Sequence, residues 1–246
     1  MKSASEKRRI AGRNSVREAI ESGNVRCIYC RQPLRGDLVD IVDRARRKGI
    51  KVKEVDAQEL DRLSPGVRHQ GIVAELPEFV YADLQDVVAK AKEAEQSFLV
   101  LVDGVEDPHN LGAIIRTAEC AGAAAVVVPA HRNVGVTEVV HKTSAGAAEW
   151  LPIVRIGNIS QTLDKLKEAG FWVAGADMHG EQSYLQADWR GHIVLVVGNE
   201  GKGMSRLTKE KCDFLVQIPM YGQVSSLNVS VAAGLMMYAI ASVQRS

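Results

Sequence analysis

The stretch DPHNLGAIIRTAECAG, residues 107–122, joins a helix start to an apolar helical face, and it decides the fold of the second part of the chain. Asp107 is a favourable N-cap residue, and Pro108 suits the first helical position. An apolar strand is predicted just before it, at residues 98–102. Strands that alternate with helices build a parallel sheet covered on both faces. We therefore expect an α/β fold around this helix.

Arg116 is the first candidate for chemistry in this stretch. At 100° per residue it projects roughly 140° away from the apolar stripe of the predicted helix. Gly112 and Ala113, one turn earlier, are small and would let a bulky backbone approach the guanidinium. A guanidinium can bind a phosphate through two parallel hydrogen bonds. An ordinary solvated arginine also fits this position, and Asn110 in the first turn could contact a ligand or brace the loop.

Two further stretches, VVGNEGKGM (196–204) and IPMYGQVSSLNVSVAAG (218–234), also place a loop between a strand and a helix. The glycines around Glu200 would admit a ligand against the backbone, although Glu200 also suits a structural role. Ser225 and Ser226 are expected to cap a helix that begins at Leu227. Parallel sheets bind ligands at the carboxyl ends of their strands. Neither a P-loop nor a dinucleotide fingerprint is present, which disfavours a nucleotide-dependent oxidoreductase.

The first part of the chain, residues 1–76, predicts a smaller α/β domain. Its strands are expected at 25–29, 50–55 and 71–75, and its helices at 15–21, 36–48 and 57–63. It holds 17 Lys and Arg against 11 Asp and Glu, a net charge of +6, whereas the remainder carries −5. A basic domain suits a polyanionic partner, although a solvated charged surface gives the same count.

The second domain is expected at 98–246, after a segment, 77–97, that we interpret as a linker or as the first helix of that domain. Its further strands are expected at 124–128, 151–156, 171–174, 193–197 and 214–218. No apolar run approaches the ~18 residues of a membrane helix, and no secretory signal is recognisable. Cys27 and Cys30 form a CxxC without a second pair or a nearby histidine, so we expect buried, reduced thiols rather than a metal site. These features favour a cytoplasmic protein without a membrane partner.

Together the three loops resemble the SpoU group of the SPOUT RNA 2′-O-ribose methyltransferases. Two earlier stretches, GRNSVREAI (12–20) and HQGIVAE (69–75), resemble the ribosomal-protein-like RNA-binding domain of that family. With both domains the chain is similar to 23S rRNA guanosine 2′-O-methyltransferases of the RlmB type. The resemblance implies an α/β fold with a small N-terminal RNA-binding domain and a C-terminal parallel-sheet domain. It also implies a trefoil knot in the C-terminal domain, around 198–203 and 218–227.

The resemblance also implies S-adenosylmethionine as cofactor, 23S rRNA as substrate, no metal, and a homodimer whose interface includes the C-terminal helix. The implied catalytic residues are Asn110, Arg116, Glu200, Ser226 and Asn228. The implied cofactor-binding residues are Gly198, Asn199, Gly203, Ile218, Met220, Ser226 and Leu227. Because the pKa of a guanidinium lies above ~12, Arg116 is expected to bind the phosphate beside the target ribose rather than to act as a base.

Two other functions stay open. A resistance-type methyltransferase would modify another rRNA nucleotide, since RNA shape and loop context select the site. A non-catalytic RNA-binding factor for ribosome assembly would carry a degenerate methyltransferase domain. The intact set of Arg116, Glu200, Ser226 and Asn228 disfavours this second alternative.

Overall fold

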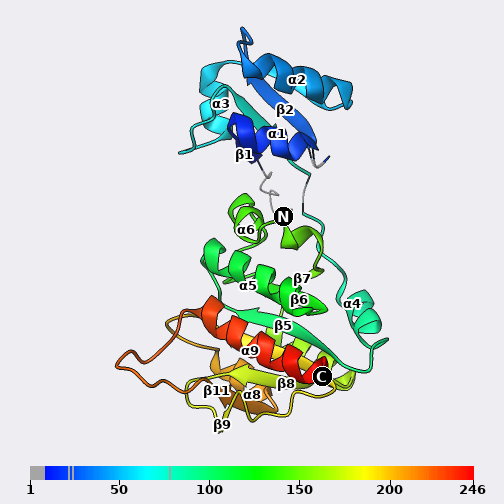
Figure 1. Cartoon of the computed structure of the whole chain (residues 1–246), viewed down its shortest axis with the longest axis vertical. Coiled ribbons are helices and arrows are strands. Elements are labelled where there is room, and N and C mark those ends of the chain that lie inside the picture. The colour runs from blue at the N-terminus through cyan, green and yellow to red at the C-terminus, as the bar shows by residue number, and fades with distance from the viewer. Residues whose placement is uncertain (1–8, 22, 24, 78) are drawn as a thin grey trace. The chain divides into compact units, whose positions relative to one another are not determined.

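The computed structural model describes residues 9–21, 23, 25–77 and 79–246, and it divides the chain into two compact units (Figure 1). Unit 1 is Met1–Val80 and unit 2 is Tyr81–Ser246. Most of the expected linker, 77–97, therefore belongs to unit 2. The reason is packing: Ala82 pairs with Val154 through a backbone hydrogen bond from the Ala82 N–H to the Ile153 carbonyl, and nearby side chains of the same segment are buried.

Unit 1 is a mixed four-stranded sheet in the order β1-β4-β2-β3, in which β4 is antiparallel to both neighbours and β2 is parallel to β3. The strands are β1 (Arg9–Ala11), β2 (Cys27–Arg31), β3 (Lys51–Val55) and β4 (Ile72–Glu75). The helices are α1 (Arg13–Glu21), α2 (Asp37–Arg47) and α3 (Ala57–Leu63). Side chains alternate across a strand, so Ile28 packs in the cluster of α1 and α2, whereas Tyr29 packs with α3.

The two cysteines of β2 are buried and their thiols are free, as the sequence predicted. Burial raises the pKa of the Cys30 thiol, which keeps it protonated and unreactive. Within the described residues, no group of three or more His, Cys, Asp and Glu side chains is arranged to hold a metal ion. In the same part of the chain, no helix combines the length and the apolar character needed to cross a membrane.

Unit 2 is built on a seven-stranded sheet in the order β7-β6-β5-β10-β8-β11-β9, and every pair of neighbouring strands is parallel. The strands are β5 (Ser97–Asp103), β6 (Ala125–Pro129), β7 (Ile153–Ile156), β8 (Trp172–Ala176), β9 (Gln182–Ser183), β10 (His192–Gly198) and β11 (Phe214–Gln217). The two central strands, β5 and β10, are almost wholly apolar because both faces of the sheet are covered.

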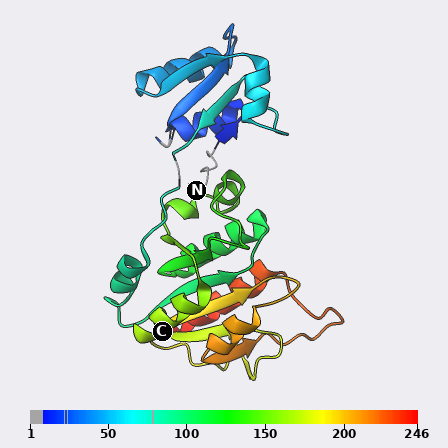
Figure 2. The same cartoon turned by 180° about the vertical axis from the view of Figure 1, so that it is seen from behind.

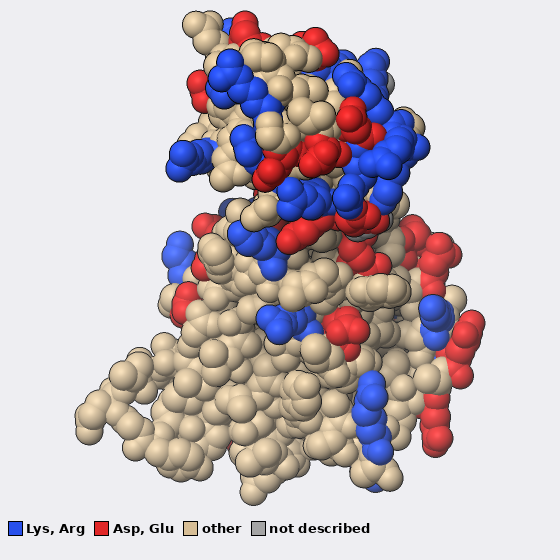
Figure 3. Space-filling view, turned by 45° about the horizontal axis from the view of Figure 1, so that its top comes forward, with Lys and Arg blue, Asp and Glu red and all other residues tan. Residues whose placement is uncertain are grey.

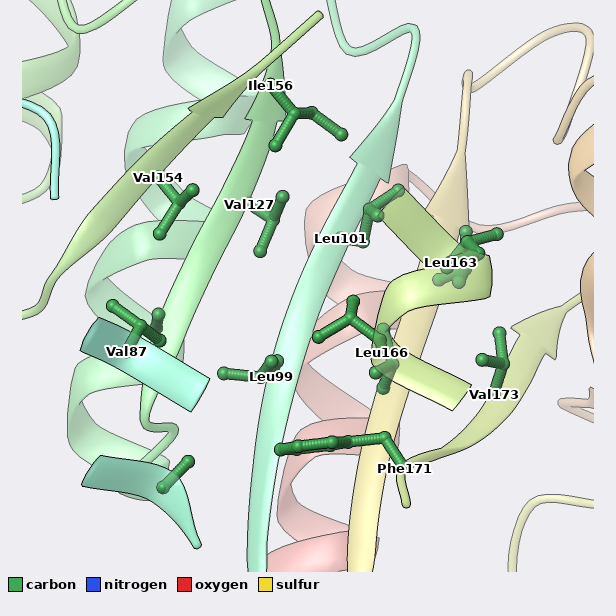
Figure 4. Close-up of a cluster of buried hydrophobic side chains, with 14 of the residues drawn as sticks. Val87, Leu99, Leu101, Val127, Val154, Ile156, Leu163, Leu166, Phe171 and Val173 are labelled. Atoms are coloured by element: carbon green, nitrogen blue, oxygen red, sulfur yellow. The ribbon is translucent and has the colours of Figure 1, made fainter. Parts of the chain in front are cut away.

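Helices lie on both faces of this sheet (Figures 1 and 2). They are α4 (Leu84–Ala91), α5 (Pro108–Ala121), α6 (Glu138–Thr143), α7 (Ile159–Glu168), α8 (Arg206–Lys211) and α9 (Val229–Gln244), together with a short 3-10 helix, Ala147–Glu149. Val87 of α4 and Leu163 and Leu166 of α7 pack against Leu99 and Leu101 of β5 (Figure 4). In Figure 1, α5 and α9 cover the opposite face.

The expected strands of unit 2 all form, and each end lies within two residues of its expected position. The sheet places β5 beside β10, so the loops that follow these two strands meet at one edge. That edge is where ligands bind in parallel sheets. The fold therefore positions the first two candidate loops side by side.

Candidate active site

Helix α5 begins as its sequence predicts, at the carboxyl end of β5. The Asp107 carboxylate accepts a hydrogen bond from the backbone N–H of His109 at 2.9 Å, and Pro108 is the first helical residue. This start places Asn110 in the first turn with only 9% of its surface exposed. A buried amide needs hydrogen-bond partners, and it finds them in the two other loops.

Asn110, Glu200 and Asn228 form a closed hydrogen-bond network. The Nδ2 of Asn228 donates to Asn110 Oδ1 and to Glu200 Oε1, both at 2.9 Å. The Nδ2 of Asn110 donates to Glu200 Oε2 at 3.4 Å. Each residue comes from a different one of the three loops, so the network joins segments more than 100 residues apart in the sequence. Three of the five expected catalytic residues are thus brought together.

Asn228, and not the preceding serines, caps helix α9. Its Oδ1 accepts hydrogen bonds from the backbone N–H of Ser230 at 2.9 Å and from that of Val231 at 3.4 Å. The helix begins at Val229, so the expected start at Leu227 with capping by Ser225 and Ser226 was wrong. Asparagine is the better cap here because its Oδ1 serves the helix while its Nδ2 serves the network.

The loop after β10 is a tight turn that its own residues close. The Nδ2 of Asn199 donates to the Gly104 carbonyl at 2.8 Å, and its Oδ1 accepts from the backbone N–H of Gly201 at 2.9 Å. The backbones of Asn199 and Gly203 exchange hydrogen bonds at 3.0 and 2.8 Å. A Cβ at Gly198 would lie 2.2 Å from the carbonyl carbon of Gly203, so only glycine fits there.

A pocket of about 330 Å³ lies next to the third loop. Four of the expected cofactor-binding residues line it: Ile218, Met220, Ser226 and Leu227. Gly198, Asn199 and Gly203 are not in its lining, and their contact with a cofactor stays a prediction. The other residues of the wall are Ala176, Asp177, Met178, His179, Gln217, Ser225, Ala232 and Met236. Residues 176–179 lie at the carboxyl end of β8. This position at a strand end is the sequence signal by which they could have been predicted to line a ligand site.

The third loop has backbone groups to offer a ligand. No hydrogen bond joins residues 218–227 to any other part of the chain that the structure describes. A run of backbone donors and acceptors beside a partly apolar pocket is suited to bind a polar, flat molecule. Ser226 is exposed in this loop and does not belong to the network of Asn110.

Asp177 is the carboxylate of the pocket wall, and 5% of its side chain is exposed. Burial acts to raise its pKa. The ion pair with Lys209 and the hydrogen bond from the backbone N–H of His179 outweigh burial, so the pKa lies below its usual value. Asp177 is therefore charged at neutral pH.

Arg116 is exposed on α5, and it forms no hydrogen bond or ion pair with any described residue. Its guanidinium is available to a ligand. We expected Gly112 to open space beside Arg116 for a ligand, and this was wrong. Gly112 is buried against α6. A Cβ at Gly112 would lie 2.6 Å from the Cβ of Thr143. The small residue serves the contact between α5 and α6 instead.

Comparisons with known proteins identify the family of the chain. Residues 97–238 match the model of the SpoU rRNA Methylase family, and residues 9–82 match a model described as RNA 2′-O ribose methyltransferase substrate binding. YacO of Bacillus subtilis, described as a TrmH family tRNA/rRNA methyltransferase, is 42% identical over 236 residues, which cover 94% of each chain. A protein of Staphylococcus haemolyticus with the same family description is 42% identical over 234 residues.

Solved structures give the same result. The SpoU methyltransferase AviRb from Streptomyces viridochromogenes, in complex with the cofactor AdoMet, is 26% identical with a TM-score of 0.69, covering 96% of this chain and 89% of that one. The A. aeolicus TrmH/SpoU tRNA modifying enzyme is 29% identical with a TM-score of 0.55, covering 65% of this chain and 83% of its own. The chain therefore belongs to the SpoU rRNA methylase family of RNA methyltransferases.

Proposed function

We propose that the protein uses S-adenosylmethionine to methylate the ribose 2′-hydroxyl of a guanosine in 23S rRNA. The observation that carries this proposal is the network of Asn110, Glu200 and Asn228, which ties the three loops together beside the pocket. S-adenosylmethionine supplies a methyl group on a positively charged sulfonium, which is already a strong electrophile. The task left to the protein is to align the ribose and to favour loss of its proton.

The pocket suits this cofactor in size and chemistry. Its volume of about 330 Å³ lies within the range of small-molecule sites. Ile218, Leu227 and Met236 offer an apolar wall for the adenine ring, and the free backbone groups of 218–227 can bind its nitrogen atoms. We also propose that the loops 198–203 and 218–227 form the trefoil knot of the family.

Arg116 is proposed to bind the phosphate beside the target ribose. A guanidinium stays protonated at every physiological pH, so it cannot accept the proton of the hydroxyl. Its positive charge instead stabilises the negative charge that develops on the ribose oxygen. Asn110, Glu200 and Asn228 hold the loops in place and orient the ribose, and Ser226 contacts substrate or cofactor from the pocket wall.

Two observations support rRNA over tRNA as the substrate. Unit 1 matches the substrate-binding model of the family over residues 9–82. The solved structure described as a tRNA modifying enzyme covers only 65% of this chain, so about a third of the chain has no counterpart in it. Unit 1 also carries the excess of positive charge that binding to RNA requires. We propose the cytoplasm as its location, which agrees with free cysteine thiols throughout the described part of the chain.

A second copy of the chain is the proposed partner at the face where α5 meets α9. That face holds a groove of about 650 Å³. Val231, Leu235 and Tyr238 of α9 expose 51%, 40% and 54% of their surfaces there. A helix that is apolar on all sides is normally buried, so this exposed side is expected to pack in a homodimer.

Incubating the protein with labelled S-adenosylmethionine and unmodified total rRNA tests the proposal. We expect label in 23S rRNA at one guanosine. The phosphodiester bond that follows this guanosine should resist alkaline cleavage, because the methylated 2′-oxygen cannot attack it. Label on another rRNA nucleotide would favour the resistance-type alternative. Absence of transfer to rRNA, with transfer to tRNA in a parallel reaction, would contradict the proposed substrate.

A further inference from the structure

Methyl transfer to a ribose requires that the hydroxyl lose its proton, and the residues of the site differ in their ability to accept one. The amides of Asn110 and Asn228 have no basic atom, and the guanidinium of Arg116 stays protonated. The hydroxyl of Ser226 is no stronger a base than the ribose hydroxyl itself. Of the five expected catalytic residues, Glu200 is therefore the one whose side chain can take up a proton.

The cap of α9 fixes the orientation of both amides in the network. Asn228 Oδ1 accepts a hydrogen bond from the backbone N–H of Ser230, so Nδ2 is the atom directed at Asn110 and Glu200. Asn110 then presents its Oδ1 to Asn228 and its Nδ2 to Oε2 of Glu200. Both oxygens of Glu200 thus act as hydrogen-bond acceptors, as the oxygens of an ionised carboxylate do.

Glu200 keeps the capacity to accept a further hydrogen bond. The two oxygens of a carboxylate offer about four acceptor sites, and each oxygen receives one hydrogen bond here. The residue is exposed, and it forms no ion pair with any residue that the structure describes. Two neutral amides therefore orient the carboxylate without neutralising its charge. Such a carboxylate is suited to take the proton of a bound hydroxyl.

Two other carboxylates near this edge of the sheet have structural partners. Asp103, at the end of β5, accepts hydrogen bonds from the backbone N–H of Ser205 at 2.9 Å and from the hydroxyl of Thr208 at 2.7 Å. Asp107 caps α5 through the backbone N–H of His109. These two carboxylates hold the starts of α8 and α5, which leaves them less available to a substrate than Glu200.

His109 is another group at this edge with a basic atom. It directly precedes Asn110 in α5, and consecutive helical residues project 100° apart. Its Nδ1 lies 3.4 Å from Oγ1 of Thr143 on α6, and within the described residues no hydrogen bond joins its ring to the network. The geometry therefore favours Glu200 over His109 as the proton acceptor.

We propose that Glu200 accepts the proton of the ribose 2′-hydroxyl during methyl transfer, an inference that rests on the proposed function for the ribose as methyl acceptor. The ribose oxygen bonds to the methyl carbon as the carbon–sulfur bond breaks, and the electron pair of that bond stays on sulfur. The hydroxyl proton passes to Oε2 of Glu200, whose hydrogen bond from Asn110 is the longer of the two. Because Glu200 is exposed, the proton then passes to water.

The pH dependence of methyl transfer separates a proton acceptor from a residue that only holds the loops. Single-turnover rates with unmodified total RNA are measured from about pH 6 to about pH 9 for the unchanged protein, Glu200→Gln and Glu200→Asp. Glu200→Gln should lose about a hundredfold near neutral pH, and its rate should then rise about tenfold per pH unit as hydroxide replaces the carboxylate. Glu200→Asp keeps a carboxylate, so it should keep the pH dependence of the unchanged protein at a lower rate.

The other charged and titratable groups on the elements that meet at Glu200 are the same in both Glu200 variants. They are Asp103, Glu106, Asp107, His109, Arg116, Lys202 and Tyr221. Dividing each rate by that of the unchanged protein at the same pH cancels their titration. Charged side chains are also sparse on the face of unit 2 that Figure 3 shows, whereas unit 1 carries many. Glu106→Gln, which removes an exposed carboxylate outside the network, is the matched control and should follow the unchanged protein at every pH.

A rate of Glu200→Gln that is lower by the same factor at every pH would overturn the inference, because it would show a role in positioning alone. A rate of His109→Gln that rises about tenfold per pH unit would assign the proton to His109 and would also overturn it. Mapping the methylated nucleotide in the same reactions tests the proposed function separately. Label at another nucleotide, or in tRNA, would contradict the proposed substrate, while the pH profiles would still decide the role of Glu200.

Discussion

At the scale of single residues, Asn228 shows how the site and the fold share one side chain. Its Oδ1 caps α9, and its Nδ2 donates to Asn110 and Glu200. A substitution can remove the hydrogen bonds of Nδ2 and keep the capping function of Oδ1. Serine keeps an oxygen that can cap a helix but lacks the amide donor, whereas alanine lacks both.

We expect Asn228→Ser to keep the cap of α9 and to lose catalytic turnover by about tenfold or more, because the network loses its central donor. Asn228→Ala should lose turnover to a similar extent and should also lower the free energy of unfolding by about 1 kcal/mol. Thermal unfolding and single-turnover methyl transfer measure the two effects. Equal stability of the two variants would contradict the capping role.

Arg116 provides the second prediction at this scale. Arg116→Lys keeps the positive charge and loses the planar fork, so turnover should fall about tenfold to a hundredfold while S-adenosylmethionine binds as before. Arg206→Lys, on the exposed side of α8, is the matched control and should behave like the unchanged protein. Turnover of Arg116→Lys near that of the control would rule out a bidentate role.

At the scale of elements, the three glycines of the turn after β10 differ in what they permit: Gly198 has no room for a side chain, Gly203 has a φ of 65°, and Gly201 is restricted by neither. A Cβ at Gly198 would collide with the backbone of Gly203, whereas the nearest atom to a Cβ at Gly201 is Oδ1 of Asn199 at 3.7 Å. Backbone atoms cannot move aside as the end of a flexible side chain can. The same substitution therefore has different consequences at two positions of one loop.

We expect Gly198→Ala to lower the free energy of unfolding by about 2 kcal/mol or more, because the turn must open to admit the methyl group. The displaced loop should also weaken methyl transfer through Glu200. Gly201→Ala should change neither property appreciably. Chemical denaturation of the two variants gives the comparison, and equal destabilisation by both would contradict this description of the turn.

Several elements could be predicted from sequence, and others could not. The buried strands of unit 2 and the start of α5 carry strong signals, namely apolar runs and an Asp-Pro pair. Strands β1 and β9 have three and two residues, too few to show a period. The cap of α9 was misplaced because Ser225, Ser226 and Asn228 are all good caps, and only packing selects among them.

The candidate site also has features that the sequence predicts and features that it does not. Residues of the loops were identified because polar and glycine-rich stretches follow strands. The hydrogen bonds between Asn110, Glu200 and Asn228 could not be derived from local patterns, since they depend on which strands become neighbours. Asp177 was missed because its significance comes from burial beside Lys209, which the sequence does not reveal.

At the scale of the whole molecule, the exposed apolar side of α9 allows the proposed homodimer to be tested. Leu235→Glu places a charge in the groove shared with α5 and should convert the dimer to a monomer. Leu207→Glu changes a leucine of α8 that is more exposed than Leu235 and lies outside the groove, and it should leave the proposed dimer intact. Analytical ultracentrifugation distinguishes the two, and a monomeric unchanged protein would contradict the interface.

The pairing of β5 with β10 also sets the order in which the chain can mature. Ser97 aligns with His192 in the sheet, so the centre of unit 2 joins strands separated by nearly a hundred residues. All four strands of unit 1 precede residue 80 and can associate during translation while the rest is still being made. Unit 2 must wait for nearly its entire sequence, and such long-range closure is slow. Until β10 has been made, one edge of the apolar strand β5 therefore stays unpaired in the nascent chain, where a chaperone can bind it.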